Sequence, residues 1–384
     1  MENYIVSARK YRPGTFQDVV GQSHITQTLK SAILTQQLAH AYLFSGPRGV
    51  GKTTCARILA KAINCENLSK EGEPCNTCSA CANFNNGQSI IIHELDAASN
   101  NKVEDIRNLI EQTRYAPARG NSGRDTRSIY IVDEVHMLTS QAFNAFLKTL
   151  EEPPAHVLFI LATTERHKIL PTILSRCQKF DFKRIKAEDI AKHLEYISDA
   201  EKVKFEYSAL QQIAIKADGG LRDALSLYDQ LVSFSGGNLT FKTVLENLNI
   251  LDYDYYFKAV NFIVQNNHVE LLLMLDEVIE KGFEARDFLA GLTEHFRNLL
   301  MCLEPRTVAL LETSEQIKEQ YLAQSRAVAP MLLLNAFNIC SETDIKMKTA
   351  THPRYTIELL LHKLAYLSQA MYVTISSEDE KKKP

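Results

Sequence analysis

The stretch Gly46-Pro47-Arg48-Gly49-Val50-Gly51-Lys52-Thr53-Thr54 has the spacing G-x-x-x-x-G-K-[ST] of a phosphate-binding loop. Its glycines allow a tight turn in which successive backbone N–H groups point inward at phosphate oxygens. Lys52 would place a positive charge beside the β- and γ-phosphates, and Thr53 would offer a hydroxyl to Mg²⁺. Residues 41–44 read as a short buried strand and residues 54–63 as a helix, so the context favours a nucleotide site over a chance match in a Gly-rich turn.

A second element predicts that the nucleotide is hydrolysed as well as bound. Residues 128–132 form a β-branched run typical of a buried parallel strand, and Asp133 and Glu134 follow it directly. At the carboxyl end of such a strand, Asp133 would hold the Mg²⁺ shell and Glu134 would orient and activate the attacking water. Acidic residues after a strand can also simply face solvent, but beside the phosphate-binding loop the catalytic interpretation is favoured.

Four of the eight cysteines fall in one short segment, residues 64–82, with nine, two and two residues between them. They are Cys65, Cys75, Cys78 and Cys81. This spacing favours a tetrahedral zinc site, in which each sulfur lies about 2.3 Å from the ion. Disulfides are the main alternative, and a reducing cytoplasm disfavours them. The polar residues between the cysteines would hardly fold unaided, so the zinc is expected to be structural. The other four cysteines are expected to be small core residues.

Composition limits the class of protein. The chain has 384 residues, 45% of them hydrophobic and 23% charged, which is ordinary for a globular protein of two or three domains. No run approaches the roughly 18 apolar residues of a membrane-spanning helix. Met1–Tyr4 lack the start of a secretory signal, so a cytoplasmic protein with no membrane partner is expected. The net charge of -3 gives no general attraction to nucleic acid, and any DNA contact must come from a local or assembled basic surface.

The order of predicted elements indicates an α/β domain followed by helical ones. Buried strands are expected at 41–44, 90–95, 128–132 and 157–162, alternating with helices, as in a parallel sheet covered on both faces over residues 1–179. A small helical segment is expected over 180–243, broken at Asp218-Gly219-Gly220. An all-α domain that contributes to subunit contacts is expected over 244–373, and a disordered polar tail over 374–384.

Further motifs, individually weak, occur in an order that is specific. Lys10-Tyr11-Arg12-Pro13, followed by Phe16-Gln17-Asp18-Val19-Val20-Gly21-Gln22, resembles the N-terminal box of clamp-loader ATPases of the AAA+ superfamily. Leu161-Ala162-Thr163-Thr164-Glu165, Ser175-Arg176-Cys177 and Gly219-Gly220-Leu221-Arg222 resemble later boxes of the same family. The resemblance implies that Thr163 senses the γ-phosphate, that Arg176 completes the site of a neighbouring subunit, and that Arg222 is a second sensor carried by a helical lid. It also implies a set of residues around the nucleotide base, namely Ala8, Tyr11, Arg12, Pro13, Val19 and Val20.

The cysteine insertion narrows the resemblance to the gamma/tau subunits of the bacterial DNA polymerase III clamp loader. It covers the whole chain, as an ATPase core, a helical lid and a helical collar. It implies an ATPase with ATP, Mg²⁺ and structural zinc that loads a sliding clamp onto primer-template DNA during replication. The implied partners are other clamp-loader subunits, further copies of the chain in a ring and the clamp, with helicase and polymerase as partners of any continuation beyond Pro384. The chain shows no polymerase carboxylate constellation of its own.

The sequence also allows two other functions. One is a different AAA+ remodeller, such as a helicase motor or an unfoldase, although the chain has no aromatic-hydrophobic pore-loop signature. The other is a scaffold that binds nucleotide without turnover, against which the intact loop and Glu134 speak. Arg176 could be an ordinary surface residue, and Arg222 could have a solvated structural role. The histidines at 93, 136 and 167 are read as structural residues and not as metal ligands.

Overall fold

A computed structural model describes residues 5–117, 126–248, 251–311, 313 and 315–380. Two sequence predictions fall on residues outside this range: the missing secretory signal at Met1–Tyr4, and residues 381–384 of the polar tail. The chain divides into two compact units, Met1–Asn238 and Leu239–Pro384. The predicted α/β core and the small helical segment both belong to the first unit. The predicted boundary at residue 243 falls within a helix of the second unit, α11 (Phe241–Asn247).

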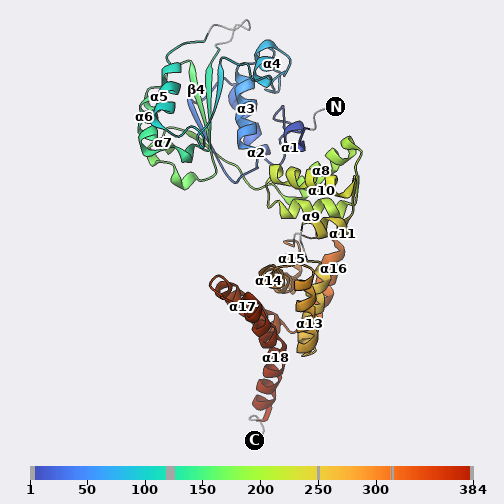
Figure 1. The fold of residues 1–384 in the computed structure, drawn as a ribbon. Helices are drawn as coiled ribbons and strands as arrows, with labels where there is room; N and C mark the ends of the chain where they lie inside the picture. The colour runs from blue at the N-terminus through green and yellow to red at the C-terminus, as the bar shows by residue number, and fades with distance from the viewer. Residues whose placement is uncertain (1–4, 118–125, 249–250, 312, 314, 381–384) are drawn as a thin grey trace. The chain divides into compact units, whose positions relative to one another are not determined.

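The first unit is built on a five-stranded sheet with the order β2-β3-β4-β1-β5 (Figure 1). All its neighbouring strands run parallel. The strands are β1 (Ala41–Ser45), β2 (Ile92–Asp96), β3 (Ser128–Asp133), β4 (Val157–Thr163) and β5 (Gln178–Asp181). The four predicted strands are therefore confirmed. The sequence misses β5, because this short edge strand has an exposed, polar pattern in which Phe180 is the one buried residue.

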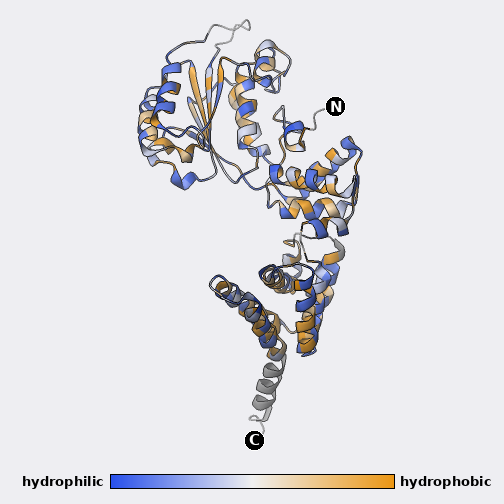
Figure 2. Ribbon diagram, viewed as in Figure 1, coloured by the Kyte–Doolittle hydropathy of each residue, from blue (hydrophilic) through white to orange (hydrophobic). Residues whose placement is uncertain are grey.

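Helices cover both faces of the sheet, and the side chains of each central strand alternate between them. In β3, Ile129 and Ile131 pack into one hydrophobic core, and Tyr130 and Val132 into the other. Figure 2 shows these central strands as the hydrophobic layer between more polar helices. On one face lie α2 (Ser23–Leu34) and α3 (Lys52–Ile63), with α4 (Ser79–Asn85) beyond them. On the other lie α5 (Val103–Gln112), α6 (Ser140–Glu151) and α7 (Pro171–Leu174).

The rest of the first unit consists of short connecting elements and a helical lid. The short elements are α1 (Ser7–Lys10), the 3₁₀ turns η1 (Val135–Met137) and η2 (Arg166–Lys168), and β6 (Lys204–Phe205). The lid helices are α8 (Ala187–Glu201), α9 (Tyr207–Lys216) and α10 (Leu221–Ser235). The predicted break at residues 218–220 separates α9 from α10, and Ala224, Leu225, Tyr228 and Leu231 form the buried stripe of α10.

The second unit is helical, as the sequence predicts. The chain enters it through β7 (Asn238–Leu239), and its helices after α11 are α12 (Tyr253–Val264), α13 (His268–Glu280), α14 (Ala285–Met301), α15 (Pro305–Val308), α16 (Glu315–Ala327), α17 (Pro330–Met347) and α18 (Pro353–Glu380). These helices share one hydrophobic core. α18 extends as far as Glu380, into the residues 374–384 for which the sequence predicts a disordered polar tail. Adding a turn to an existing helix costs far less than starting one, which explains how α18 continues into polar sequence.

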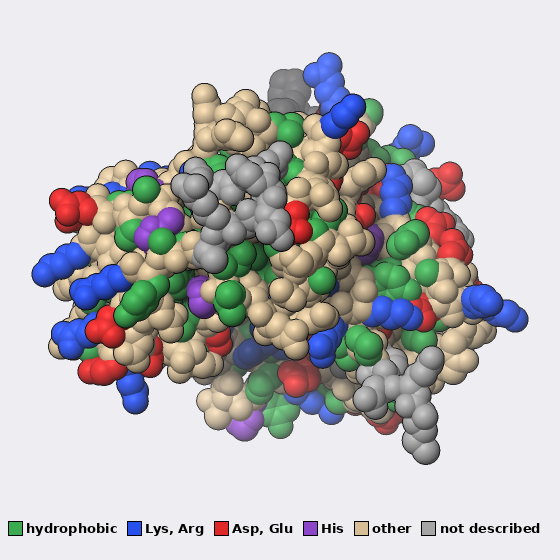
Figure 3. Space-filling view, turned by 90° about the horizontal axis from the view of Figure 1, so that it is seen from above, with side chains coloured by type: hydrophobic (Ala, Val, Ile, Leu, Met, Phe, Trp, Pro, Cys, Tyr) green, Lys and Arg blue, Asp and Glu red, His purple; other side chains and the backbone are tan. Residues whose placement is uncertain are grey.

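The surface agrees with the near balance of 43 basic and 46 acidic residues. On the face seen in Figure 3, Lys and Arg side chains alternate with Asp and Glu side chains. Among the described residues, no helix is both long and apolar enough to cross a bilayer.

Candidate nucleotide site and cysteine cluster

A cleft of about 780 Å³ opens at the carboxyl ends of β1 and β3. Its lining comes from the N-terminal segment, the phosphate-binding loop, the ends of β2 and β3, and the lid. All six residues predicted to border the base line it, together with Arg48, Gly49, Val50, Gly51, Lys52, Thr53, Thr54, Asp133, Glu134 and Arg222. The structure thus brings most of the predicted binding residues to one place, although they span more than half of the chain.

The backbone of the phosphate-binding loop requires glycine at two points. Gly46 has φ +151°, and a Cβ there would lie 2.4 Å from the carbonyl oxygen of Phe182. Gly51 has φ +99° at the start of α3, in a conformation that L side chains rarely adopt. These glycines therefore allow the loop to pass close to the chain after β5 and then turn into the helix. Gly46 and Pro47 do not line the cleft, but their carbonyl oxygens accept hydrogen bonds from Lys52.

Lys52 is 6% exposed, and its ammonium donates to the carbonyl oxygens of Gly46 and Pro47 at 2.8 and 2.7 Å. Burial lowers the pKa of Lys52, and the charges of Glu134 and Asp133 partly offset this effect. A buried ammonium beside the N-terminus of α3 is a favourable place for an anion, since both the charge and the free N–H groups of the helix attract it.

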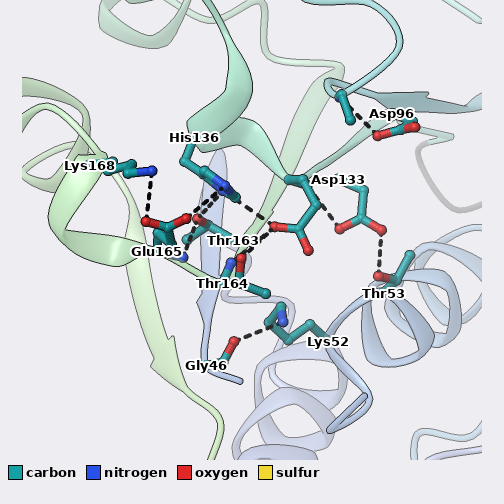
Figure 4. Close-up of polar contacts among 12 residues, drawn as sticks. Gly46, Lys52, Thr53, Asp96, Asp133, His136, Thr163, Thr164, Glu165 and Lys168 are labelled. Carbon is teal, nitrogen blue, oxygen red and sulfur yellow. Dashed lines mark hydrogen bonds and ion pairs between the residues drawn. The ribbon is translucent and has the colours of Figure 1, made fainter. Parts of the chain in front are cut away.

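Asp133 is the last residue of β3 and lies beside Thr53 (Figure 4), and Glu134 directly follows it in the chain. The hydroxyl of Thr53 donates to Asp133 Oδ2 at 2.8 Å, so the two predicted magnesium ligands are neighbours. Glu134 has φ +47°, which is uncommon for a residue with a side chain and clusters at functional sites. Its carboxylate accepts from the backbone N–H and the hydroxyl of Thr164, at 3.1 and 3.0 Å. The end of β4 therefore fixes the carboxylate of Glu134.

Thr163 is fully buried and does not line the cleft. Its hydroxyl lies 3.0 Å from Nδ1 of His136 and accepts from the N–H of Glu165. His136 in turn lies 3.3 Å from the carboxylate of Glu134. The predicted sensor thus reaches the catalytic candidate through His136. The sequence does not reveal this link, nor the role of Thr164, because both depend on the register of β3 against β4.

The lid meets the loop directly, because the N–H of Arg222 donates to the carbonyl oxygen of Gly49 at 3.4 Å. Leu221, Leu225 and Ile185 also line the cleft. The sequence predicts a helical segment here but does not assign the two leucines to the site. Leu221 directly follows Gly219-Gly220, and this position is the signal that could have identified it.

Among the residues predicted for the nucleotide site, Arg176 alone lies apart from the cleft and its supporting contacts. It follows α7, and its guanidinium donates to the carbonyl oxygen of Thr172 at 2.7 Å and to Glu151 at 2.8 Å. Its side chain is 33% exposed. Because Arg176 is partly exposed and does not line the cleft of its own chain, its location is compatible with action on another chain.

The four predicted zinc ligands form a cluster beyond the end of α3. The sulfur atoms of Cys65, Cys75, Cys78 and Cys81 all lie within 4.8 Å of one another. Four sulfurs placed tetrahedrally at 2.3 Å from zinc would be about 3.8 Å apart, so the donor set fits this ion. All four positions would be filled by protein, as in a structural site.

Backbone groups around the cluster favour thiolate at one position. Burial raises the pKa of Cys75, but the N–H groups of Thr77 and Cys78 more than offset it, and the pKa falls to about 6. These N–H groups lie 3.5 and 3.2 Å from the Cys75 sulfur. Burial raises the pKa values of Cys65 and Cys81, which in an apolar pocket need a cation to hold them as thiolates. The other four cysteines are buried and lie outside the cluster, as predicted.

Comparisons with known families divide the chain in the same order as the fold. A family described as the DNA polymerase III delta subunit matches residues 21–186. The ATPase lid domain of the DNA polymerase III clamp loader subunit matches residues 189–237. Domain III of the DNA polymerase III subunits gamma and tau matches residues 239–374.

Similar proteins agree with this assignment. DNA polymerase III subunit tau of Bacillus subtilis is 42% identical over 95% of this chain and 64% of its own length. The tau subunit of Escherichia coli is 45% identical over 73% of this chain and 43% of its own length. This chain therefore spans about half to two thirds of these relatives. The gamma subunit of Buchnera aphidicola subsp. Baizongia pistaciae is 35% identical, over 95% of this chain and 98% of its own length. The chain belongs to the AAA+ family of gamma and tau subunits of the bacterial DNA polymerase III clamp loader.

Proposed function

We propose that this chain is an ATP-hydrolysing motor subunit of the replicative clamp loader, which loads a sliding clamp onto primed DNA. The observation that carries the proposal is the cleft at the end of β3, where Lys52, Thr53, Asp133 and Glu134 meet. A subunit that only held nucleotide as a scaffold would not need a carboxylate fixed as that of Glu134 is.

Within the cleft, Lys52 and the N–H groups of the loop bind the phosphates, and the six residues of the N-terminal segment border the base. Thr53 and Asp133 are the residues that would hold Mg²⁺, which when bound neutralises charge that develops on the phosphate oxygens. Glu134 orients the attacking water and accepts its proton, while Thr164 and His136 keep the carboxylate in place. Thr163 acts on this arrangement through His136.

Two arginines couple the site to its surroundings. Arg222 lies at the start of α10 and next to the loop, so a bound γ-phosphate would favour one position of the lid. Arg176 is assigned to the cleft of the neighbouring subunit. To reach it, the guanidinium must leave Glu151, and this exchange of one carboxylate for a phosphate makes the subunit interface sensitive to the nucleotide.

The proposed assembly is a ring that contains further copies of this chain and other clamp-loader subunits. Its clients are the sliding clamp and primer-template DNA, and helicase and polymerase would bind regions outside this chain. The four cysteines are assigned to one structural zinc ion, with no role in the chemistry of ATP.

The test is the steady-state ATPase rate of this chain, alone and with its clamp-loader partners, with clamp and primed DNA added separately and together. The proposal predicts strong stimulation only when partners, clamp and primed DNA are all present. A rate that ignores clamp and primer would mean that this motor acts on a different client, and no hydrolysis under any condition would leave a nucleotide-binding scaffold.

A further inference from the structure

One segment connects the nucleotide cleft to both the lid and the cysteine cluster. We call residues 7–20 the N-terminal strap. Residues on both sides of Gly14 line the cleft, namely Ala8, Arg9, Tyr11, Arg12 and Pro13 before it and Val19 and Val20 after it. The strap has only one short helix, α1, so its path must be fixed by contacts with other parts of the first unit.

The N-terminal end of the strap is hydrogen-bonded to the lid. The N–H of Ser7 donates to the Asp229 carboxylate of α10 at 2.7 Å, and the Ser7 hydroxyl donates to the same group. Lys10 and Tyr11 both contact the carboxylate of Glu201, at the end of α8. This end would therefore move with the lid.

The second end is held by a carboxylate from the cysteine insertion. Glu73 is 9% exposed and accepts from the backbone N–H groups of Phe16 and Gln17 at 2.7 and 3.1 Å. It also pairs with the ammonium of Lys30 in α2. A buried carboxylate that satisfies two backbone donors of a loop and one cation fixes that loop strongly, since each donor would otherwise lose its partner.

A second contact comes from within the cluster itself. Asn76 lies between Cys75 and Cys78 with φ +58°, and its amide donates to the carbonyl oxygen of Gly14 at 3.2 Å. The buried ammonium of Lys61 donates to the same oxygen at 3.2 Å and to the side-chain oxygen of Asn76. The turn that brings two of the sulfurs together therefore also presents Asn76 to the strap.

From these contacts we infer that the cysteine insertion positions the base-binding side of the nucleotide cleft, and that Glu73 and Asn76 are its positioning residues. The inference rests on the proposed nucleotide site. Neither residue lines the cleft. Both act through the strap, whose second half they hold against the core while the lid holds its beginning.

The test uses the variants Glu73→Gln and Asn76→Gly in the whole chain. Glutamine keeps the size of Glu73 but removes its charge, and glycine accepts the positive φ of Asn76 while removing its amide. Glu71→Gln is the matched control, because Glu71 is exposed in the same insertion. Zinc content, the melting temperature and hydrogen exchange of amides in β1 and β3 report whether the fold is intact.

We expect the amides of Phe16 and Gln17 to exchange at least about tenfold faster in Glu73→Gln, with zinc retained. The Kd of a fluorescent ATP analogue should rise about tenfold in both variants, since the base side is no longer preorganised. Binding of inorganic triphosphate, which has no base, should be unchanged. The control should match the parent throughout.

The outcomes separate this inference from the function on which it rests. If the parent chain binds no ATP, the proposed nucleotide site fails, and this inference falls with it. If the parent binds ATP but the variants bind it equally well, or if the exchange of Phe16 and Gln17 does not change, the strap does not depend on the insertion. Equal weakening of ATP and triphosphate would also overturn the inference, because the effect would then extend to the phosphate-binding loop.

Discussion

The nucleotide cleft and the cysteine cluster lie at opposite ends of one helix, α3, and they are built in different ways. The cleft end starts at Lys52, and the helix ends at Ile63, shortly before Cys65. At the cleft, the geometry comes from backbone: glycines with positive φ, strand ends held in register, and a glutamate in a left-handed conformation. At the cluster, it comes from four sulfur side chains on short turns.

The two regions also differ in what stabilises them. The strands under the cleft belong to two extensive cores, so the cleft keeps its shape before any ligand binds. The cluster is surrounded by a much smaller apolar group, in which Cys65, Cys78 and Cys81 pack against Leu68 and Ala80. A region with so little buried apolar surface would depend on a bound metal ion to stay folded. The cleft should therefore respond to changes of single functional groups, and the cluster to loss of the zinc ion that we propose it binds.

The largest effect is expected from a residue outside the cleft. Arg176→Ala should leave ATP binding unchanged and reduce clamp- and DNA-stimulated hydrolysis in the assembled complex by roughly 10³-fold or more. The cleft of each chain would keep its shape but would lack the guanidinium that Arg176 of the next subunit supplies. Equal losses of binding and hydrolysis would show that Arg176 supports its own chain and does not act on a neighbour.

Lys52→Ala tests the charge at the cleft end of α3. We expect the Kd of ATP, measured by calorimetry, to rise on the order of 100-fold, because a buried ammonium that meets the phosphates is lost. Lys192→Ala, at an exposed position of α8, is the matched control and should bind like the parent. Zinc content should be the same in both variants, since the cluster does not depend on the cleft.

Cys78→Ser tests the other end of the helix. Zinc per chain, measured by elemental analysis, should fall, and amide exchange over residues 65–81 should become about 30-fold faster or more as the insertion loosens. Cys340→Ala, a buried cysteine outside the cluster, should retain the metal. If Cys78→Ser kept full zinc and normal exchange, the cluster would not be a four-thiolate structural site.

The smallest effect compares two glycines, Gly51 at the cleft end of α3 and Gly87 shortly after α4. Gly51 and Gly87 have φ +99° and +72°, and a Cβ at either would meet no atom within 4 Å. Alanine at each should lower the free energy of unfolding by about 1 to 2 kcal/mol, measured by denaturant titration, because of backbone strain alone. Only Gly51→Ala should also weaken ATP binding. A similar loss of ATP binding in Gly87→Ala would show that the loss in Gly51→Ala is not specific to the phosphate-binding loop.

The sequence predicts best those features that depend on neighbouring residues. The loop around Lys52, the strand before Asp133 and the cysteine spacing are local patterns, and the structure contains each of them. β5 is missed because an exposed edge strand lacks the apolar pattern of a buried one.

Local sequence patterns do not predict the contacts between segments that are distant in the chain. Glu73 and Phe16 are 57 positions apart, and no pattern in either segment predicts their hydrogen bond. The same is true of Glu134 and Thr164, which meet only because β3 and β4 pair in one register. The fold therefore brings most of the predicted site residues together, while the residues that support them emerge only from the structure.

The most direct test of the proposed motor function uses the assembled clamp loader in which every copy of this chain, and no other subunit, carries Glu134→Gln. ATP binding by the assembly and ATP turnover with clamp and primed DNA are measured on the same preparation. We predict that binding is retained and that turnover falls at least about 100-fold, because the group that activates water is lost. Turnover equal to that of the parent assembly would show that hydrolysis takes place on another subunit and that this chain is not the motor.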